Sequence, residues 1–349
     1  MSEFTRSLEQ LSRTDEPRFG GKSANLGELL AADIPVPPGF AISAAAFQAF
    51  VRDAGLEHRI SSAVAGVAAG DVDAIGRASL EISEAMRFAP LPKMVRNEVA
   101  ERYGHLGADS PAVAVRSSAV GEDSADATFA GQQETYLWVR GPEQVCDAVR
   151  DCWVSLYSPP AISYRARLGQ ALQEPPAMGV TVQLMVDAEV SGVMFTCNPV
   201  TGDPSMVAIN ASWGLGLAVV GGEVTPDDYL VSKVTGEVVR EHVHTKDVEY
   251  VPNPSGGGAV RVEVPPDRSE RACLDQSALA QLVDVAKRVE RHFGTHQDIE
   301  WALARNNPEA VFLVQARPVT GLAKKDKPKQ PASAMSLIMN TFGAGPKSD

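Results

Sequence analysis

The sequence predicts an α+β fold with a helical N-terminal part and a sheet-rich C-terminal part. Apolar residues recur at helical spacing through much of 21–104, whereas the stretch from 180 to about 264 consists of short β-type runs separated by turn residues. A chain of 349 residues is long enough for two or more domains. We therefore expect an N-terminal lobe over 1–180, a C-terminal lobe over 181–321 and a linker or tail over 322–349.

In the N-terminal part, periodicity and breaker residues predict the order of the elements. A helix is expected over 21–32, because Leu26, Leu29 and Leu30 share a face and prolines follow. The later elements are a strand at 40–42, a helix from a Ser43 cap through Asp53, mostly helical structure over 57–104, a short strand at 112–115 that ends before Arg116, a loop over 119–132 and a helix opened by Pro142.

In the C-terminal part, short strands give way to a helix and then a hairpin. Residues 276–293 place apolar side chains on one helical face. Residues 297–319 form two strand-like runs around a turn signal, Asn306-Asn307-Pro308.

The hairpin carries polar residues at strand spacing. Asp298 and Glu300 are two apart, as are Gln315 and Arg317, so antiparallel pairing would bring all four to one sheet face. One interpretation is a cross-strand salt bridge on a solvated face. The other is a site for a hard cation and a polyphosphate, because oxygen ligands suit Mg²⁺ and the arginine fork suits phosphate. The hairpin alone leaves both open.

Lysine 22 lies at a predicted helix start, after Gly20 and Gly21. A cation there opposes the helix dipole, so a nearby anion would explain it, and a solvated surface Lys22 is the alternative. The P-loop motif is absent, since its first glycine would fall at Glu16. A Rossmann fingerprint is absent too, because Val219 stands where the third glycine is required.

Two further segments suit a nucleotide. Arg116 is followed by two hydroxyl residues and a loop ending in Gly131 and Gln132, which suits phosphate contacts, although a surface loop with a structural arginine fits equally. The run VTVQLMV covers residues 180–186. Its backbone can border a purine, and ordinary core packing is the alternative.

Composition excludes several function classes. A net charge of −12 disfavours nucleic acid as a partner. The four cysteines form no CxxC pair, the N-terminus does not read as a signal peptide, and no stretch reaches membrane-spanning length without charges. We expect a cytoplasmic protein without a membrane partner.

The motifs in order are GGKSANLGEL, VPPGF, AVRSSAVGEDS, FAGQQETYL, SGVMFTCNPVTGD, NASWGLG, VTPDDYLV, QDIEWA and VQARPV. Over about residues 18–320 this order resembles the nucleotide-binding region of the pyruvate phosphate dikinase and phosphoenolpyruvate synthase family. The resemblance implies an ATP-grasp fold, with two α+β lobes clamping ATP. It also implies transfer of the ATP β-phosphoryl group to a histidine, with release of AMP and phosphate.

The resemblance implies a role for each matching residue. Lys22, Arg116 and Arg317 would contact the polyphosphate, and Gly131 and Gln132 would lie over it. The remaining implied contacts are Gln183, Leu184, Met185 and Val186 at the adenine, Glu300 and Gln315 on Mg²⁺, and Asp298 near the ribose or the metal.

Two departures from the family pattern stand out. Leu217 follows the WGLG motif where the family usually has an acidic residue. No histidine lies in the family's Gly-rich Thr-Ser-His context; the six are His58, His105, His242, His244, His292 and His296. We expect a stand-alone ATP-binding subunit, similar to that of phenylphosphate synthase, which phosphorylates a partner subunit that serves pyruvate or a phenol-like acceptor. The alternatives are an ATP-binding regulatory module without transfer activity and an ATP-grasp ligase that releases ADP.

Overall fold

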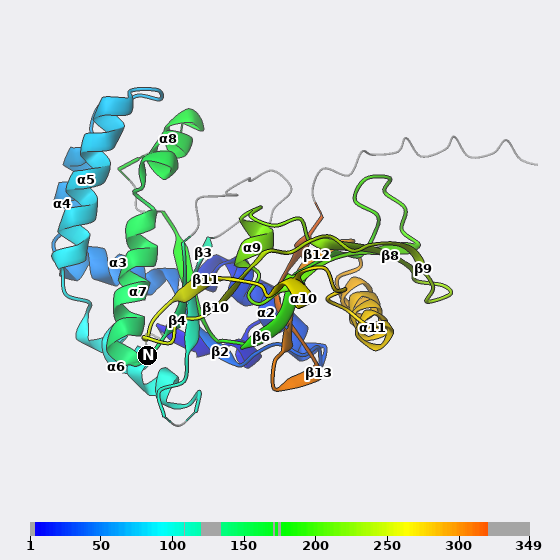
Figure 1. Ribbon diagram of the computed structural model, residues 1–349. Helices are drawn as coiled ribbons and strands as arrows, with labels where there is room; N and C mark the ends of the chain where they lie inside the picture. The colour runs from blue at the N-terminus through cyan, green and yellow to red at the C-terminus, as the bar shows by residue number, and fades with distance from the viewer. Residues whose placement is uncertain (1–3, 108, 120–133, 170–171, 174–175, 320–349) are drawn as a thin grey trace, which may run out of the picture.

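Two antiparallel sheets organise the computed structural model, which describes residues 4–107, 109–119, 134–169, 172–173 and 176–319 (Figure 1). The five-stranded sheet, called the N-terminal sheet, has the strand order β1-β2-β5-β3-β4, and the six-stranded, C-terminal sheet has the order β13-β12-β6-β7-β8-β9. This is a mixed helix and sheet structure, in agreement with the predicted α+β class.

Helices cover the N-terminal sheet on the side away from the C-terminal sheet (Figure 1). Trp153 anchors their core, because its ring stacks on Phe50 at 5.4 Å and is fully buried. The strands are β1 (Thr5–Ser7), β2 (Gly39–Ile42), β3 (Val113–Ala119), β4 (Thr135–Val139) and β5 (Met178–Leu184). The helices are α3 (Ala44–Asp53), α4 (Glu57–Ala63), α5 (Val72–Phe88), α6 (Lys93–Gly104), α7 (Pro142–Ser155) and α8 (Pro159–Arg167).

The C-terminal sheet packs on α11 (Gln276–Phe293), in the predicted position. Asp275 caps this helix by accepting from the Ala278 N–H at 2.8 Å, and Gly294 ends it in the left-handed conformation. The strands are β6 (Ala188–Phe195), β7 (Met206–Trp213), β8 (Asp227–Ser232), β9 (Val238–His242), β12 (Gln297–Ala304) and β13 (Asn307–Pro318). The short elements beside this sheet are α9 (Leu217–Val220), α10 (Pro266–Ser269) and the hairpin β10 (Val248–Pro252) with β11 (Ala259–Glu263).

One helix, α2 (Gly21–Ala31), joins the two sheets. The Ser23 hydroxyl lies 2.7 Å from that of Thr181 on β5, and the Asn25 amide donates to the Ala316 carbonyl on β13 at 3.3 Å. Leu26 and Leu29 belong to the core of the C-terminal sheet. The short elements η1 (Leu8–Gln10), η2 (Arg13–Asp15) and α1 (Glu16–Phe19) precede it. The predicted helix over 21–32 is thereby confirmed, and it has a bridging position.

Some predicted boundaries differ from the structure. Strand β3 runs to Ala119, so Arg116 lies inside it and the prediction of a strand ending before Arg116 is wrong. Pairing with β5 along the whole strand explains this extension, because Arg116 opposes Thr181 in the ladder. The lobe boundary predicted after residue 180 falls inside β5, which pairs with β2 and β3. Ser43 precedes α3 as predicted, without a side-chain capping hydrogen bond.

A fully buried ion pair ties the edge of the C-terminal sheet to the segments around it. The Lys246 ammonium donates to the Asp227 carboxylate at 2.6 Å, and both side chains have no solvent exposure. The same carboxylate accepts from the backbone N–H groups of His244 and Cys273 at 2.9 and 2.8 Å. Asp227 therefore connects β8 with the segments before β10 and α11, and its charge is neutralised by one lysine.

Among the described residues, no helix is long and apolar enough to cross a membrane. All four cysteines are free and buried. Burial raises the pKa of the Cys146 thiol to about 11, so this thiol is protonated at neutral pH.

Candidate functional site

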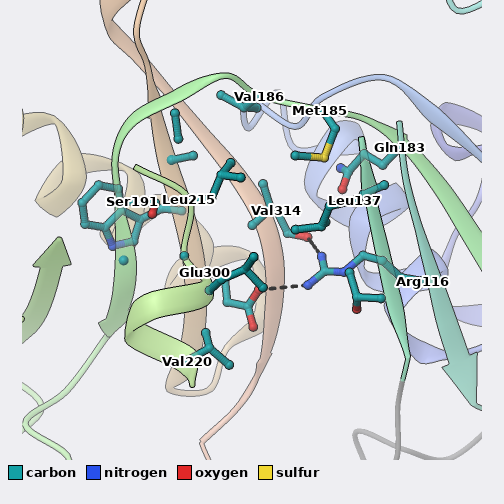
Figure 2. A pocket seen from close by; sticks show the side chains of 18 of the residues that line it. Arg116, Leu137, Gln183, Met185, Val186, Ser191, Leu215, Val220, Glu300 and Val314 are labelled. Atoms are coloured by element: carbon teal, nitrogen blue, oxygen red, sulfur yellow. Dashed lines mark hydrogen bonds and ion pairs between the residues drawn. The ribbon is translucent and has the colours of Figure 1, made fainter. Parts of the chain in front are cut away.

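A pocket of about 190 Å³ lies where the two sheets face each other (Figure 2). The N-terminal sheet contributes β3, β4 and the end of β5, and the C-terminal sheet contributes β6, β12 and β13 together with α9. Most lining side chains are apolar, and the charged ones are Arg116 and Glu300. A mostly apolar pocket with a few converging polar groups is the usual form of a small-molecule site.

Arg116 spans the gap between the sheets. Its guanidinium donates to Glu300 Oε2 at 3.0 Å, to Gln315 Oε1 at 3.2 Å and to the Val314 carbonyl at 2.9 Å. Figure 2 shows the guanidinium pointing from β3 towards Glu300 and Val314. The Arg116 and Glu300 side chains are 14% and 26% exposed, so this pair is largely shielded from water. Three residues predicted as site residues therefore meet at one point.

The hairpin has the predicted antiparallel register, with one irregularity at the site. Glu300 pairs with Gln315, but Trp301 pairs with Leu313, so Val314 is an extra residue on β13. Such a bulge leaves a backbone group outside the regular ladder. Here the Val314 carbonyl accepts from Arg116. The bulge thus supplies a third acceptor for the guanidinium.

The segment after β5 forms an apolar wall. Leu184, Met185 and Val186 line the pocket, and the Leu184 and Met185 N–H groups each donate to a carbonyl at 2.9 Å, those of Pro38 and Ala112. The buried Gln183 donates its amide to Pro37 at 3.2 Å. The predicted adenine-side residues are therefore contiguous, and all four line the pocket.

The glycine-rich segment after β7 forms a second wall, through Leu215, Gly216 and Leu217. Gly214 has a φ of +73°, and a Cβ there would lie 2.5 Å from the Tyr250 carbonyl, so only glycine fits. The Ser191 hydroxyl donates to the Gly214 carbonyl at 2.6 Å. Leu217, the residue that departs from the family pattern, starts α9 and lines the pocket at 37% exposure. An apolar side chain stands at this edge of the pocket.

Lys22, Asp298 and Arg317 lie outside the pocket lining. Lys22 is 8% exposed and donates to the Ser117 carbonyl at 3.2 Å, so the alternative of a solvated surface lysine is wrong. Arg317 donates to Asp298 at 2.9 Å across the hairpin. Burial raises the pKa of Asp298, and the neighbouring Arg317 opposes that shift. The cross-strand salt bridge, which was one of the two interpretations of the hairpin, is therefore present.

Comparison with known proteins identifies the family of this chain. The model of the family described as "Pyruvate phosphate dikinase, AMP/ATP-binding domain" matches residues 16–336. The chain belongs to this family. Two probable phosphoenolpyruvate synthases, from Methanocaldococcus jannaschii and Methanothermobacter thermautotrophicus, are each 38% identical to it over 350 residues. The phosphoenolpyruvate synthase of Pyrococcus furiosus is 36% identical over 387 residues.

These relatives are longer than the chain. The alignments cover 98%, 99% and 98% of this chain but 29%, 50% and 47% of the three relatives, in the order given. The remaining parts of these relatives have no counterpart in the sequence given. Membership of the dikinase AMP/ATP-binding family assigns this chain an ATP-binding role of a kinase-like kind.

The predicted Mg²⁺ ligands, Glu300 and Gln315, both carry the oxygen atoms that Mg²⁺ prefers. Within the described ranges, no group of three or more His, Cys, Asp or Glu side chains is placed to hold a metal. However, Glu300 Oε2 and Gln315 Oε1 both accept from the same Arg116 nitrogen, so two oxygens already converge on one cation. Mg²⁺ usually keeps several waters and takes phosphate oxygens in addition to one or two carboxylates.

Some lining residues of this dikinase-family pocket were not predicted. Thr135 and Leu137 on β4 lie two apart and line the pocket, and Ser191 supports the glycine-rich wall. No strand was predicted over 135–139, although the aromatic and β-branched run TYLWV is a signal that could have indicated one. The predicted loop residues Gly131 and Gln132 fall outside the residues that the structure describes.

Proposed function

We propose that the chain binds MgATP in the pocket between the two sheets and is the phosphoryl-donating subunit of a split dikinase. In this proposal ATP and water are consumed, AMP and phosphate are released, and the β-phosphoryl group stays on an imidazole nitrogen of a partner subunit. The partner then transfers it to pyruvate or a phenol-like acceptor. The observation that supports the proposal most directly is the convergence of Arg116, Glu300 and Gln315 at the polar end of an apolar pocket.

The arrangement of the two sheets suits an ATP-grasp clamp. The base would lie against the wall at 184–186, while its phosphates would extend towards Arg116. Phosphoryl transfer depends mainly on positioning and charge neutralisation, so a rigid hairpin with an arginine and two oxygen ligands is well suited to it. When bound, Mg²⁺ would neutralise phosphate charge between Glu300 and Gln315.

A partner histidine is proposed because the described histidines are placed elsewhere. His292 and His296 contact Glu28 and Glu290, and His244 contacts the Pro226 carbonyl. In the described part of the chain, none of the six histidines lines the pocket. The curated relatives extend beyond the region that aligns with this chain.

The deciding experiment incubates the chain with ATP radiolabelled at the β-phosphorus and with proteins that copurify from the native source. The expected result is an acid-labile, base-stable label on a partner, together with AMP. Formation of ADP with an acyl phosphate would support the ligase alternative. ATP binding without AMP formation, in the presence of a copurifying partner that contains a Thr-Ser-His segment, would leave the regulatory module as the better explanation.

Replacing Arg317 with lysine is expected to slow transfer about a hundredfold, because lysine cannot form two parallel hydrogen bonds with a phosphate. The measurement is the initial rate of partner labelling at saturating MgATP. Arg305→Lys is the matched control, since Arg305 lies near the turn of the same hairpin and pairs with Glu189. Near-normal transfer by Arg317→Lys would assign Arg317 a purely structural role as the partner of Asp298.

A further inference from the structure

The two oxygens proposed to hold Mg²⁺ are already occupied by a cation of the protein. Arg116 donates from one nitrogen, Nη2, to both Glu300 and Gln315, at 3.0 and 3.2 Å. A second nitrogen, Nη1, donates to the Val314 carbonyl at 2.9 Å. The guanidinium therefore stands between the same two side chains that a metal ion would have to contact.

The contacts of this arginine are incomplete. Arg116 Nε is buried and has no hydrogen-bond partner among the described residues. A buried donor without a partner is unfavourable, and an arginine fork is best satisfied by two acceptors on one planar or tetrahedral anion. The contacts with Glu300 and Gln315 neutralise the charge of Arg116 but leave its Nε donor without an acceptor. A phosphate placed nearby would therefore compete with these two side chains for the guanidinium.

We infer that Arg116 is a resident counter-cation of the metal ligands and that it competes with Mg²⁺ for Glu300 and Gln315. Without nucleotide, it neutralises the Glu300 carboxylate and keeps metal affinity low. When the polyphosphate enters, the guanidinium turns to the phosphate oxygens and releases both ligands to the metal. Arg116 thus makes metal binding depend on nucleotide binding. This inference rests on the proposed nucleotide site and adds an order of binding to it.

The inference has a thermodynamic consequence. If nucleotide removes a competitor of the metal, each ligand raises the affinity for the other by the same factor. Removing the guanidinium should raise affinity for the metal alone and reduce this coupling. A residue with only a structural role would leave metal affinity unchanged or lower it.

The test measures Mn²⁺ binding to the whole chain without nucleotide, from the electron paramagnetic resonance signal of free Mn²⁺. Arg116→Met keeps the apolar stem and removes the charge, and is expected to bind Mn²⁺ about tenfold more tightly than the wild type, the value of one charged hydrogen bond. Arg116→Lys keeps a positive charge on a shorter side chain, so it is expected to raise the affinity for Mn²⁺ by a smaller factor. Unchanged or weaker Mn²⁺ binding by folded Arg116→Met would overturn the inference.

Two controls make the result specific. Arg96→Met removes the same charge from an exposed arginine that pairs with Glu143, and it is expected to leave Mn²⁺ affinity unchanged. Arg116→Met combined with Glu300→Gln should return to weak binding; if binding stays tight, the ion lies elsewhere and the inference is wrong. If Arg116→Met does not fold, Arg116→Lys decides, since an unchanged affinity there also contradicts competition.

The outcome is separate from that of the proposed function. Mn²⁺ binding is measured with neither nucleotide nor partner present, whereas the proposed function is tested by partner labelling. If the chain labels its partner but Arg116 does not compete with the metal, only the inferred order of binding is wrong. If Arg116 competes with the metal but AMP is never released, the proposed transfer function is wrong.

Discussion

Replacing Glu300 with alanine is expected to reduce transfer of the ATP β-phosphoryl group to the partner by about a thousandfold, the loss typical of removing one strong transition-state contact. Glu300 is the only carboxylate that lines the pocket among the described residues, and its Oε2 lies beside the proposed position of the metal. Without it, the phosphate charge would be poorly neutralised. The fold should remain intact, because the Glu300 side chain is 26% exposed and lies outside the core clusters.

The measurement is a single-turnover labelling rate with saturating MgATP and partner. Glu300→Gln tests the charge separately from the shape, and it should lose most of the activity as well. Glu143→Ala is the matched control, since Glu143 is exposed and pairs with Arg96 far from the pocket. Circular dichroism and melting temperature establish folding for each variant. Transfer by Glu300→Ala at a rate close to the wild type would rule out the metal assignment.

Replacing Lys246 with methionine is expected to destabilise the protein by about 3–5 kcal/mol, the usual effect of removing one partner of a buried ion pair. Asp227 would keep its two backbone donors but lose its only cationic partner among the described residues, with no exposure to water. The substitution is expected to destabilise β8, because Asp227 is the first residue of that strand. Stability is measured from urea denaturation of the whole chain.

The double variant Lys246→Met with Asp227→Leu distinguishes charge burial from loss of packing. If the uncompensated carboxylate is the cause, replacing both partners should recover much of the lost stability. Lys93→Met is the comparison at an exposed lysine on α6, and it should change stability by less than about 0.5 kcal/mol. A Lys246→Met variant as stable as the wild type would show that water or another group reaches Asp227.

The Arg116 contacts give the two sheets a direct electrostatic connection. Arg116 belongs to β3 of the N-terminal sheet, and all three of its acceptors belong to β12 and β13 of the C-terminal sheet. Helix α2 makes a second, independent connection through Ser23 and Asn25. A ligand that redirects Arg116 would therefore change one link while the contacts of α2 stay in place.

Local features were predictable because they depend on neighbours in the chain. The period-two placement of Asp298, Glu300, Gln315 and Arg317 determined which side chains would face each other, and the observed register pairs Asp298 with Arg317 and Glu300 with Gln315. The 3.6-residue periodicity likewise predicted α11, whose Asp275 cap and Gly294 end are both local signals. The order of motifs also indicated the family, which the comparisons then established.

The amino-acid sequence by itself thus determined helices α2 and α11, the polar face of the hairpin and the family. Only the tertiary structure decided that Arg116 lies inside β3, that a bulge frees the Val314 carbonyl for it, and that Lys246 is buried against Asp227. Arg116 and Val314 are 198 positions apart in the chain. Periodicity describes the faces of one element, whereas such contacts depend on how separate sheets pack, which no local pattern specifies.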